Sequence, residues 1–407
     1  MLAPLLLAWL SLTPSTPVEA FAQAKPNRGK AIQEGLLWLA RHQNADGSWG
    51  GSTLMQHCKG GRPCYEGLKL GGHYDDGLTG LALLAFLRNG YDPLSKKELV
   101  DPLDNSKYVA GELVTRGLRW LKKVQRKDGA FAHEDMGFLY NQALGEIAMV
   151  EAALLEKGNE DWRNCARSGL EYLMQAQRKN PANTGLWGWS YASRLELEAD
   201  KKTKPEKLHQ ADVSATGWAV AALTAAARAG LDVRRDALDG ALEFMNSVCV
   251  TNGLVGYDFA ENAGLKVQGP DDEFEYHNGT LCSLGILIRL GTTKDLTNAF
   301  LDAAAKQIVA DPPRVAGSNL AIDYYFWFHG SEALNRLEGT EFAKGKKRHL
   351  IDPWNKSVSD VLFSLQDHQK GACSSGGWVT RDRWAYAGGP VYCTAMALLT
   401  LDWTAGK

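Results

Sequence analysis

The chain has 407 residues, of which 45% are hydrophobic and 23% are charged, as is ordinary for a globular protein with a sizeable core. Its formal net charge is −2 and its sequence pI is about 6.5, so the composition excludes the basic surface that nucleic acid or an anionic membrane would attract. Thirteen tryptophans and 42 glycines are the unusual feature of the composition.

Residues 1–22 have the pattern of a secretory signal peptide. Their apolar run "LAPLLLAWLSL" is too short to span a bilayer as a helix, and the "AFA" that ends at Ala22 fits a small-x-small cleavage site. A positive charge near Met1 is missing, which leaves a cytosolic tail as the alternative. We expect an exported protein, periplasmic or extracellular, that does not span a membrane.

An internal repeat begins directly after this segment. Ile32, Leu36, Leu39 and Gln43 are separated by steps of four, three and four residues, which place them on one face of a helix. The same spacing recurs at Val114, Leu118, Leu121 and Gln125; at Ala166, Leu170, Leu173 and Gln177; at Leu238, Leu242, Met245 and Cys249; and at Val358, Leu362, Leu365 and Gln369. Five matches to one template indicate a repeat protein.

A turn with a glycine and then a large side chain follows each of these helices, and we call it the closure turn. The glycines suit a left-handed backbone, a Gln amide can satisfy free backbone groups at a helix end, and a Trp covers that end. We interpret the motif as structural. Its Gly/large-residue pairs are Gly47/Trp49, Gly129/Phe131, Gly185/Trp187, Gly253/Val255 and Gly377/Trp378.

A second set of helices is apolar on almost all sides, which predicts burial. These segments start at Asp75, Asn141, Asp212, His277, Tyr325 and Val391, and residues 299–309 supply a sixth amphipathic helix. The chain is thus predicted to be all-α, with six hairpins of one outer and one inner helix. Because the first and last repeats both carry the full motif, a closed α/α toroid over residues 23–407 is favoured over an open solenoid.

The Gln and Gly-x-Trp pattern resembles the repeat of squalene–hopene cyclases, oxidosqualene cyclases and protein prenyltransferase β subunits. The layout is most similar to exported bacterial prenyltransferase/squalene-oxidase repeat proteins, whose activities are mostly undefined. The resemblance covers nearly the whole mature chain and implies the toroid fold. It implies function only weakly, because one fold hosts unrelated chemistries.

The resemblance to cyclases implies a strong carboxylic acid in a D-x-D-D motif, which this sequence does not contain. Its nearest approaches are Asp75-Asp76 and Asp271-Asp272-Glu273, so Asp75, Asp76 and Asp272 are the candidate catalytic acids. Asp75 and Asp212 both lie four residues before a Thr-Gly pair, which favours helix capping as the alternative role.

The resemblance to prenyltransferases implies zinc held by an Asp, a Cys and a His. The matching positions are Asp212, Ser214 in place of the Cys, and His277, so we assign no metal ligands and no cofactor. Cys58 and Cys64 could form a disulfide or remain two loop thiols. Zinc is disfavoured there because C-x5-C is an unusual ligand spacing with only His57 beside it.

In a toroid the starts of the inner helices converge at one opening, which we call the mouth. Aromatic and polar residues gather at these starts, and helix dipoles there favour anionic groups. Ordinary packing is the alternative interpretation. The candidate ligand-binding residues are His73, Tyr74, Asn141, Asp212, His277, Tyr324, Tyr325, Trp327 and Tyr392.

Three functions are compatible with these patterns. The first is an exported toroid that binds an isoprenoid-like or other small molecule, or a protein partner, at the mouth without cyclase or transferase chemistry. The second is an isoprenoid cyclase or transferase with a non-standard acid. The third is a carbohydrate-active toroid, which would need two facing carboxylates. The observation that separates these functions is whether the central cavity is apolar and lined by aromatic residues around a buried carboxylate. A polar cleft with two facing carboxylates would support sugar chemistry, and a cavity filled by side chains would exclude both enzymes.

Overall fold

The structure is a computed structural model that describes residues 27–405, except for 59–63, 65–69, 133–137, 184, 251, 261–265, 269–272, 276–277, 294–298, 316–321, 339–347 and 380–381. The predicted signal peptide lies outside the described residues. Among the helices of this described part, none has both the length and the apolar composition that crossing a membrane would require.

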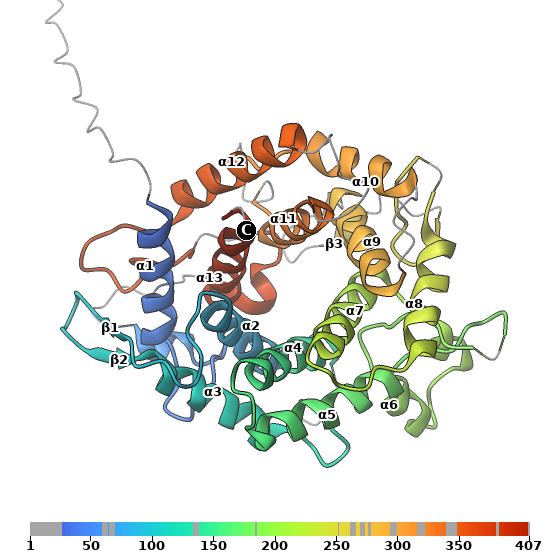
Figure 1. Ribbon diagram of the computed structural model, residues 1–407, viewed down its shortest axis with the longest axis horizontal. Coiled ribbons are helices and arrows are strands. Elements are labelled where there is room, and N and C mark those ends of the chain that lie inside the picture. Colours follow the sequence, from blue (N-terminus) through green and yellow to red (C-terminus); the bar gives the residue numbers. More distant parts are fainter. Residues whose placement is uncertain are drawn as a thin grey trace, which may run out of the picture.

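Twelve of the described helices form two concentric rings (Figure 1). The outer ring consists of α1 (Arg28–Arg41), α3 (Ala110–Val124), α5 (Glu160–Gln175), α8 (Arg235–Val248), α10 (Ala299–Ala310) and α12 (Arg348–Leu365). The inner ring consists of α2 (Asp75–Arg88), α4 (Leu139–Leu155), α7 (Val213–Arg228), α9 (Asn278–Thr292), α11 (Tyr324–Glu338) and α13 (Ala385–Trp403). The predicted alternation of outer and inner helices is confirmed.

Short elements fill the connections. A 3₁₀ turn, η1 (Leu54–His57), follows α1, and α6 (Arg194–Ala199) with a second 3₁₀ turn, η2 (Pro205–His209), lies between α5 and α7. The strands form two antiparallel hairpins that pair β1 (Glu98–Val100) with β2 (Lys107–Val109) and β3 (Lys266–Gln268) with β4 (Glu273–Glu275). These elements connect the helices and leave the helical architecture unchanged.

The ring is closed. Consecutive inner helices pack against each other, and the last one, α13, packs against both α1 and α2 (Figure 1). An open solenoid would leave these two ends apart. The expected all-α toroid is therefore confirmed.

Burial explains the two kinds of helix. The outer helix α3 buries Leu113, Val114 and Leu121 on one face and exposes Lys122 and Lys123 near its end. The inner helix α2 is buried from Asp75 to Leu87, as its nearly uniform apolar sequence predicts. A Cβ on Gly80 would lie 2.7 Å from the backbone of Leu144, so glycine permits the close approach of α2 and α4.

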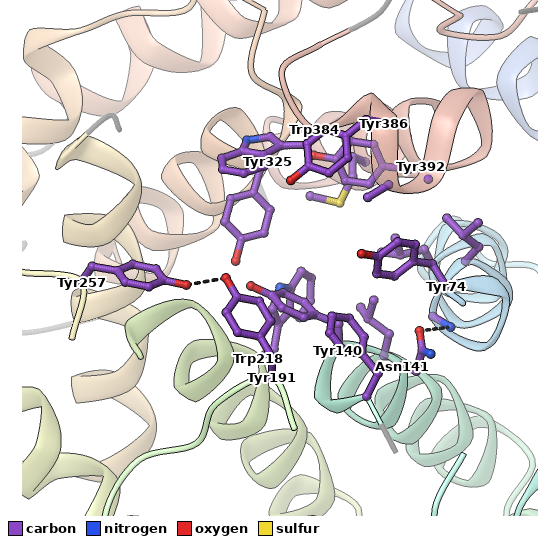
Figure 2. A pocket seen from close by; sticks show the side chains of 18 of the residues that line it. Tyr74, Tyr140, Asn141, Tyr191, Trp218, Tyr257, Tyr325, Trp384, Tyr386 and Tyr392 are labelled. Atoms are coloured by element: carbon purple, nitrogen blue, oxygen red, sulfur yellow. Dashed lines mark hydrogen bonds between the residues drawn. The ribbon is translucent and has the colours of Figure 1, made fainter. Parts of the chain in front are cut away.

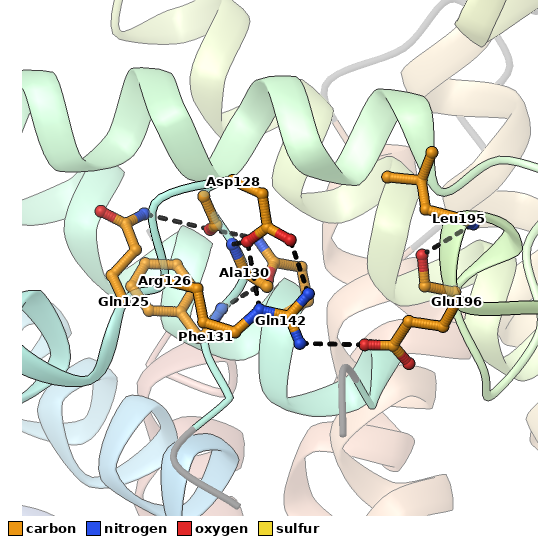
Figure 3. A network of polar contacts seen from close by, with 10 residues as sticks. Gln125, Arg126, Asp128, Ala130, Phe131, Gln142, Leu195 and Glu196 are labelled. Atoms are coloured by element: carbon orange, nitrogen blue, oxygen red, sulfur yellow. Dashed lines mark hydrogen bonds and ion pairs between the residues drawn. The ribbon is translucent and has the colours of Figure 1, made fainter. Parts of the chain in front are cut away.

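The closure-turn glutamine connects successive hairpins. Gln43 Nε2 donates to the carbonyl oxygens of Gly47, in its own turn, and of Leu113, in the next outer helix, both at 2.9 Å. Gln125, which Figure 3 labels, does the same: its Nε2 donates to the carbonyl oxygens of Gly129 and of Cys165 in α5. Each amide therefore ties one hairpin to the next, in addition to ending its own helix.

In two closure turns the sequence prediction assigned the wrong residue to the repeated position. The fourth glutamine is Gln366 and not Gln369, which is exposed beyond the end of α12. In the third repeat Gln177 Nε2 donates to the carbonyl of Trp187, and Trp189 is the buried tryptophan of the turn. Trp189 Nε1 donates to Leu173 at 2.8 Å, as Trp49 Nε1 donates to Leu39. Both turns are longer than in the first two repeats, which moves the tryptophan away from the expected spacing.

The last glutamine closes the ring. Gln366 Nε2 donates to Gly376 in its own turn at 2.8 Å and to Ala31 of α1 at 2.9 Å. Arg41 at the end of α1 donates to the carbonyl of Ser375 in the same turn. We call this junction of the last closure turn with α1 the seam.

A candidate ligand cavity

A cavity of about 510 Å³ lies at the mouth, where the N-terminal halves of the inner helices meet (Figure 2). All six inner helices contribute to its wall, through residues such as Leu78 of α2, Trp218 of α7 and Leu281 of α9. Its volume falls within the range of about 300–1,000 Å³ that is usual for small-molecule sites. The described residues that line it are Tyr74, Gly77, Leu78, Leu81, Phe138, Tyr140, Asn141, Leu144, Tyr191, Trp218, Tyr257, Leu281, Tyr325, Trp384, Tyr386, Ala387, Gly388, Tyr392 and Met396.

The wall is aromatic and uncharged. Ten of these lining residues are aromatic, and none of the described ones carries a carboxylate, an ammonium or a guanidinium group. Phe138 stacks on Tyr140 and Tyr191 with ring centroids 5.4 and 5.9 Å apart. A surface of this kind can bury an apolar ligand, and the faces of its aromatic rings can also contact a ligand that carries partial positive charge.

Tyrosine hydroxyl groups converge at one end of the cavity (Figure 2). Tyr140 donates to Ser214 Oγ at 2.7 Å, and Ser214 donates to Asp212 Oδ1 at 2.6 Å. The hydroxyls of Tyr191 and Tyr257 are hydrogen-bonded to each other, and that of Tyr257 lies 3.2 Å from Ser214 Oγ. Asp212 thus anchors a chain of hydroxyls, and its burial raises the pKa of its carboxyl group.

Two buried hydrogen-bond donors at this end have no hydrogen-bond partner among the described residues: the Tyr325 hydroxyl and the Trp218 indole Nε1. Buried donors are normally satisfied, so these two groups indicate room for an acceptor from outside the chain. His329 lies behind them, with its ring centroid 4.5 Å from that of Tyr325. Burial lowers the pKa of His329 to about 4, which keeps the imidazole neutral at physiological pH.

A buried carboxyl group, that of Asp382, lies behind Tyr392 and Trp384 of the wall. The Tyr392 hydroxyl points to Asp382 Oδ2 at 3.5 Å, and the backbone N–H groups of Tyr324 and Trp384 donate to the two carboxyl oxygens. Burial, and secondarily the neighbouring Asp323, raise the pKa of Asp382 to about 8, against the opposing effect of Arg383. Asp382 is therefore protonated over most of the neutral range.

This pKa predicts a pH dependence of stability. The folded-state pKa of Asp382 lies above the unfolded value of 3.8, so the folded state binds the extra proton. Its contribution to stability is present below about pH 4 and declines as the pH rises through about 8. We expect Asp382→Asn to abolish this decline, so that the free energies of unfolding of variant and wild type, measured by chemical denaturation, diverge in the variant's favour by up to a few kcal/mol between pH 5 and 8.5. A difference that stays constant with pH would contradict the protonated assignment.

The structure places four predicted ligand-binding residues in the wall of the cavity: Tyr74, Asn141, Tyr325 and Tyr392. The Asn141 amide also joins α4 to α2, because its Oδ1 accepts from Gly77 N (Figure 2). Its Nδ2 donates to the carbonyl of His73, just before α2. The remaining described candidates are not in the wall: His73 is exposed, and Tyr324, Trp327 and Asp212 are buried behind it.

The candidate catalytic acids are not in the wall either. Asp75 Oδ1 accepts from Gly51 N at 2.9 Å and so ties the first closure turn to α2. Asp76 is 1% exposed and lies in the first turn of α2. The expected capping role is confirmed for Asp212, which accepts from Ala215 N, but it is wrong for Asp75, because Tyr74 holds the cap position of α2. Asp272 and His277 lie outside the described residues.

Most of the aromatic residues in the wall were not predicted from the sequence. Tyr191 and Tyr257 come from closure turns, each two residues after the large residue of its turn, Trp189 and Val255. With the third turn in its correct register, this shared position would have signalled both tyrosines. Trp384 and Tyr386 lie at the start of α13, the first as its N-cap residue and the second in its first turn, where no repeat pattern marks them.

Comparison with known proteins supports the fold. No family model and no curated protein matches the sequence. An inactive variant of the α-1,6-mannanase GH76A of Salegentibacter sp. HEL1_6, in complex with α-1,6-mannotriose, superposes with a TM-score of 0.55 at 11% identity, covering 93% of this chain and 99% of that one. The unsaturated glucuronyl hydrolase of Bacillus sp. GL1 gives 0.60 at 16% identity, covering 92% and 96%.

A terpene enzyme is similar to the same degree. A variant of the type II terpene cyclase MstE from Scytonema, in complex with its substrate geranylgeranyl dihydroxybenzoate, superposes with a TM-score of 0.52 at 10% identity, covering 93% of this chain and 97% of that one. All three neighbours are α/α toroids. Identities this low establish the shared fold, and the site must decide the function.

Proposed function

We propose that this chain is an exported toroid that binds an uncharged, isoprenoid-type small molecule in the cavity at the mouth. The observation that carries the proposal is the wall itself, which is aromatic and aliphatic with no charged side chain among its described residues. The unpartnered Tyr325 and Trp218 donors at one end favour a ligand with a single acceptor group, such as an alcohol or carbonyl oxygen.

Binding is favoured over cyclisation by the low acidity of Asp382, a carboxyl group that lies behind the wall. Protonating an alkene requires a strong acid, whereas the pKa of Asp382 is raised to about 8. Tyr392, which stands between Asp382 and the cavity, has a pKa raised further above its usual value by burial. Neither group is acidic enough to start a cationic cyclisation.

The wall also disfavours the other ligand classes. Hydrolysis of a glycosidic bond uses two carboxyl groups that flank the bond, and none lines the described cavity. A diphosphate would require lysine, arginine or metal, and the described wall offers no cationic side chain. The anion preference expected from the helix dipoles is therefore not matched by the side chains, and a neutral ligand fits better.

The test is mass spectrometry of lipid extracted from the purified full-length protein. Ala387 lines the cavity on α13, and Ala387→Trp fills part of it with a large side chain. We expect an isoprenoid-class compound to co-purify with the wild type and to fall to less than about a tenth in Ala387→Trp, because the ligand and the new indole need the same space.

Ala310→Trp is the matched control, because Ala310 is exposed at the end of α10. It should retain the wild-type amount of ligand. Equal retention of the compound by both variants would place it elsewhere on the protein and contradict the proposal. Recovery of an oligosaccharide in place of a lipid would instead support the carbohydrate-active alternative that two of the structural neighbours represent.

A further inference from the structure

Four side chains with metal-binding atoms meet at the seam, and none of them lines the cavity described above. They are His42, Cys58, Cys64 and Cys373, and their ligand atoms all lie within 4.8 Å of one another. His42 follows α1, Cys58 follows η1, and Cys373 lies in the last closure turn, 331 residues after His42 in the sequence. No spacing motif could reveal this group, because ring closure brings it together.

The distances from His42 to two of the cysteines are compatible with tetrahedral coordination of a metal ion. His42 Nε2 lies 3.4 Å from Cys64 Sγ and 3.5 Å from Cys373 Sγ. Zinc bonds of about 2.3 Å to sulfur and about 2.0 Å to nitrogen, at tetrahedral angles, separate neighbouring ligand atoms by about 3.5–3.8 Å. These two distances match tetrahedral coordination, and the remaining separations, none above 4.8 Å, would shorten by up to about 1 Å around a central ion.

The imidazole is already oriented for coordination. His42 Nδ1 lies 2.7 Å from the carbonyl oxygen of Trp38, and a carbonyl can only accept, so Nδ1 carries the proton. The lone pair of Nε2 then faces the sulfur atoms. Trp38 also stacks on the imidazole ring with centroids 3.9 Å apart, and His42 is only 1% exposed. A histidine ligand whose second nitrogen is fixed by a carbonyl is the usual arrangement in metal sites.

The three cysteines are free thiols in the structure, so neither the Cys58–Cys64 disulfide considered from the sequence nor another pairing occupies the cluster. Cys64 and Cys373 are buried and Cys58 is half-buried. The backbone N–H of Cys64 points to Cys58 Sγ at 3.2 Å, a contact that stabilises a thiolate. Three thiols and an imidazole packed together without a disulfide form a soft donor set that selects zinc among the common divalent metals.

We propose that His42, Cys58, Cys64 and Cys373 bind one Zn²⁺ ion as a structural site that fastens the seam of the toroid. All four positions would be filled by protein atoms, leaving no open position for a substrate, as in structural zinc sites. The ion would link α1 and the loop after it to the last closure turn, and so hold together the two ends of the chain. Binding would displace protons from the thiols, and no oxidant is involved.

The test measures metal in the untagged full-length protein, purified without chelator. We expect about one equivalent of zinc per chain by inductively coupled plasma mass spectrometry. Cys373→Ser should reduce this to a small fraction. Cys249→Ser is the matched control, because Cys249, the residue that follows α8, is a half-buried cysteine beside Arg289 of α9 and outside the cluster. This variant should keep the full equivalent.

A second measurement keeps the proposal testable if Cys373→Ser folds poorly. Wild-type protein stripped of metal and loaded with Co²⁺ should show the thiolate charge-transfer and visible bands of a tetrahedral cobalt site, and its melting temperature should rise by several degrees on reloading with zinc. A protein that contains no zinc and develops no cobalt bands would overturn the proposal. So would a count of free thiols showing that two of the three cysteines are oxidised to a disulfide.

Discussion

Gln366→Ala is expected to lower the free energy of unfolding by about 1–3 kcal/mol, because it leaves the buried carbonyl oxygen of Gly376 without a donor and removes the hydrogen bond from the amide to the carbonyl of Ala31 in α1. Since Ala31 belongs to the first helix and Gly376 to the last closure turn, the loss falls on the seam. The measurement is chemical denaturation followed by circular dichroism, with the midpoint and slope compared between variant and wild type.

Gln369→Ala is the matched control for this prediction. Gln369 is exposed three residues further along, so its removal should change stability by less than about 0.5 kcal/mol. The eleven-residue spacing in the sequence points to Gln369, whereas the structure points to Gln366. If Gln369→Ala were the costly substitution, the closed seam described above would be wrong.

Trp189→Ala should cost about 3–5 kcal/mol, the usual range for removing a fully buried large aromatic side chain. Trp189 is 0% exposed, its indole N–H donates to Leu173, and its backbone N–H donates to Thr216 Oγ1 at 2.9 Å. The substitution therefore leaves both a cavity and an unsatisfied carbonyl at the end of α5. Thermal and chemical unfolding of the variant would measure the loss.

Trp187→Ala provides the comparison, since Trp187 lies two residues earlier in the same turn. Trp187 is half-buried and makes an edge contact with Phe244 at 5.5 Å, so its removal should cost clearly less than that of Trp189. Equal costs for the two tryptophans would contradict the assignment of Trp189 as the residue that covers the helix end.

Apolar periodicity was sufficient to predict the helices and their order. Spacing such as Ile32, Leu36 and Leu39 depends only on the helical period, and the closed ring followed from full motifs at both ends of the chain. Periodicity could not predict which glutamine and which tryptophan of each closure turn make the hydrogen bonds that end the helix. A shift of three residues, from Gln366 to Gln369, keeps an apolar helical face, and only the hydrogen bonds to Ala31 and Gly376 distinguish the two positions.

The position of the site in the fold was predicted from the sequence, but most of the residues that line it were not. Residues at inner-helix starts, such as Tyr325 and Asn141, were found because helix starts can be recognised in the sequence. Tyr257 and Trp384 come from connecting segments, whose paths depend on tertiary packing. The cluster of His42 and Cys373 depends entirely on ring closure, since their side chains meet across 331 residues of sequence.

The most direct test of the ligand proposal is a calorimetric titration of the purified, delipidated protein with geranylgeraniol and, separately, with α-1,6-mannotriose. Geranylgeraniol is a neutral isoprenoid with one hydroxyl group, which matches an uncharged wall with buried donors at one end. We predict saturable binding of geranylgeraniol, lost in Ala387→Trp and kept in Ala310→Trp, and no binding of the trisaccharide. Saturable binding of mannotriose with none of geranylgeraniol would contradict an apolar-ligand site.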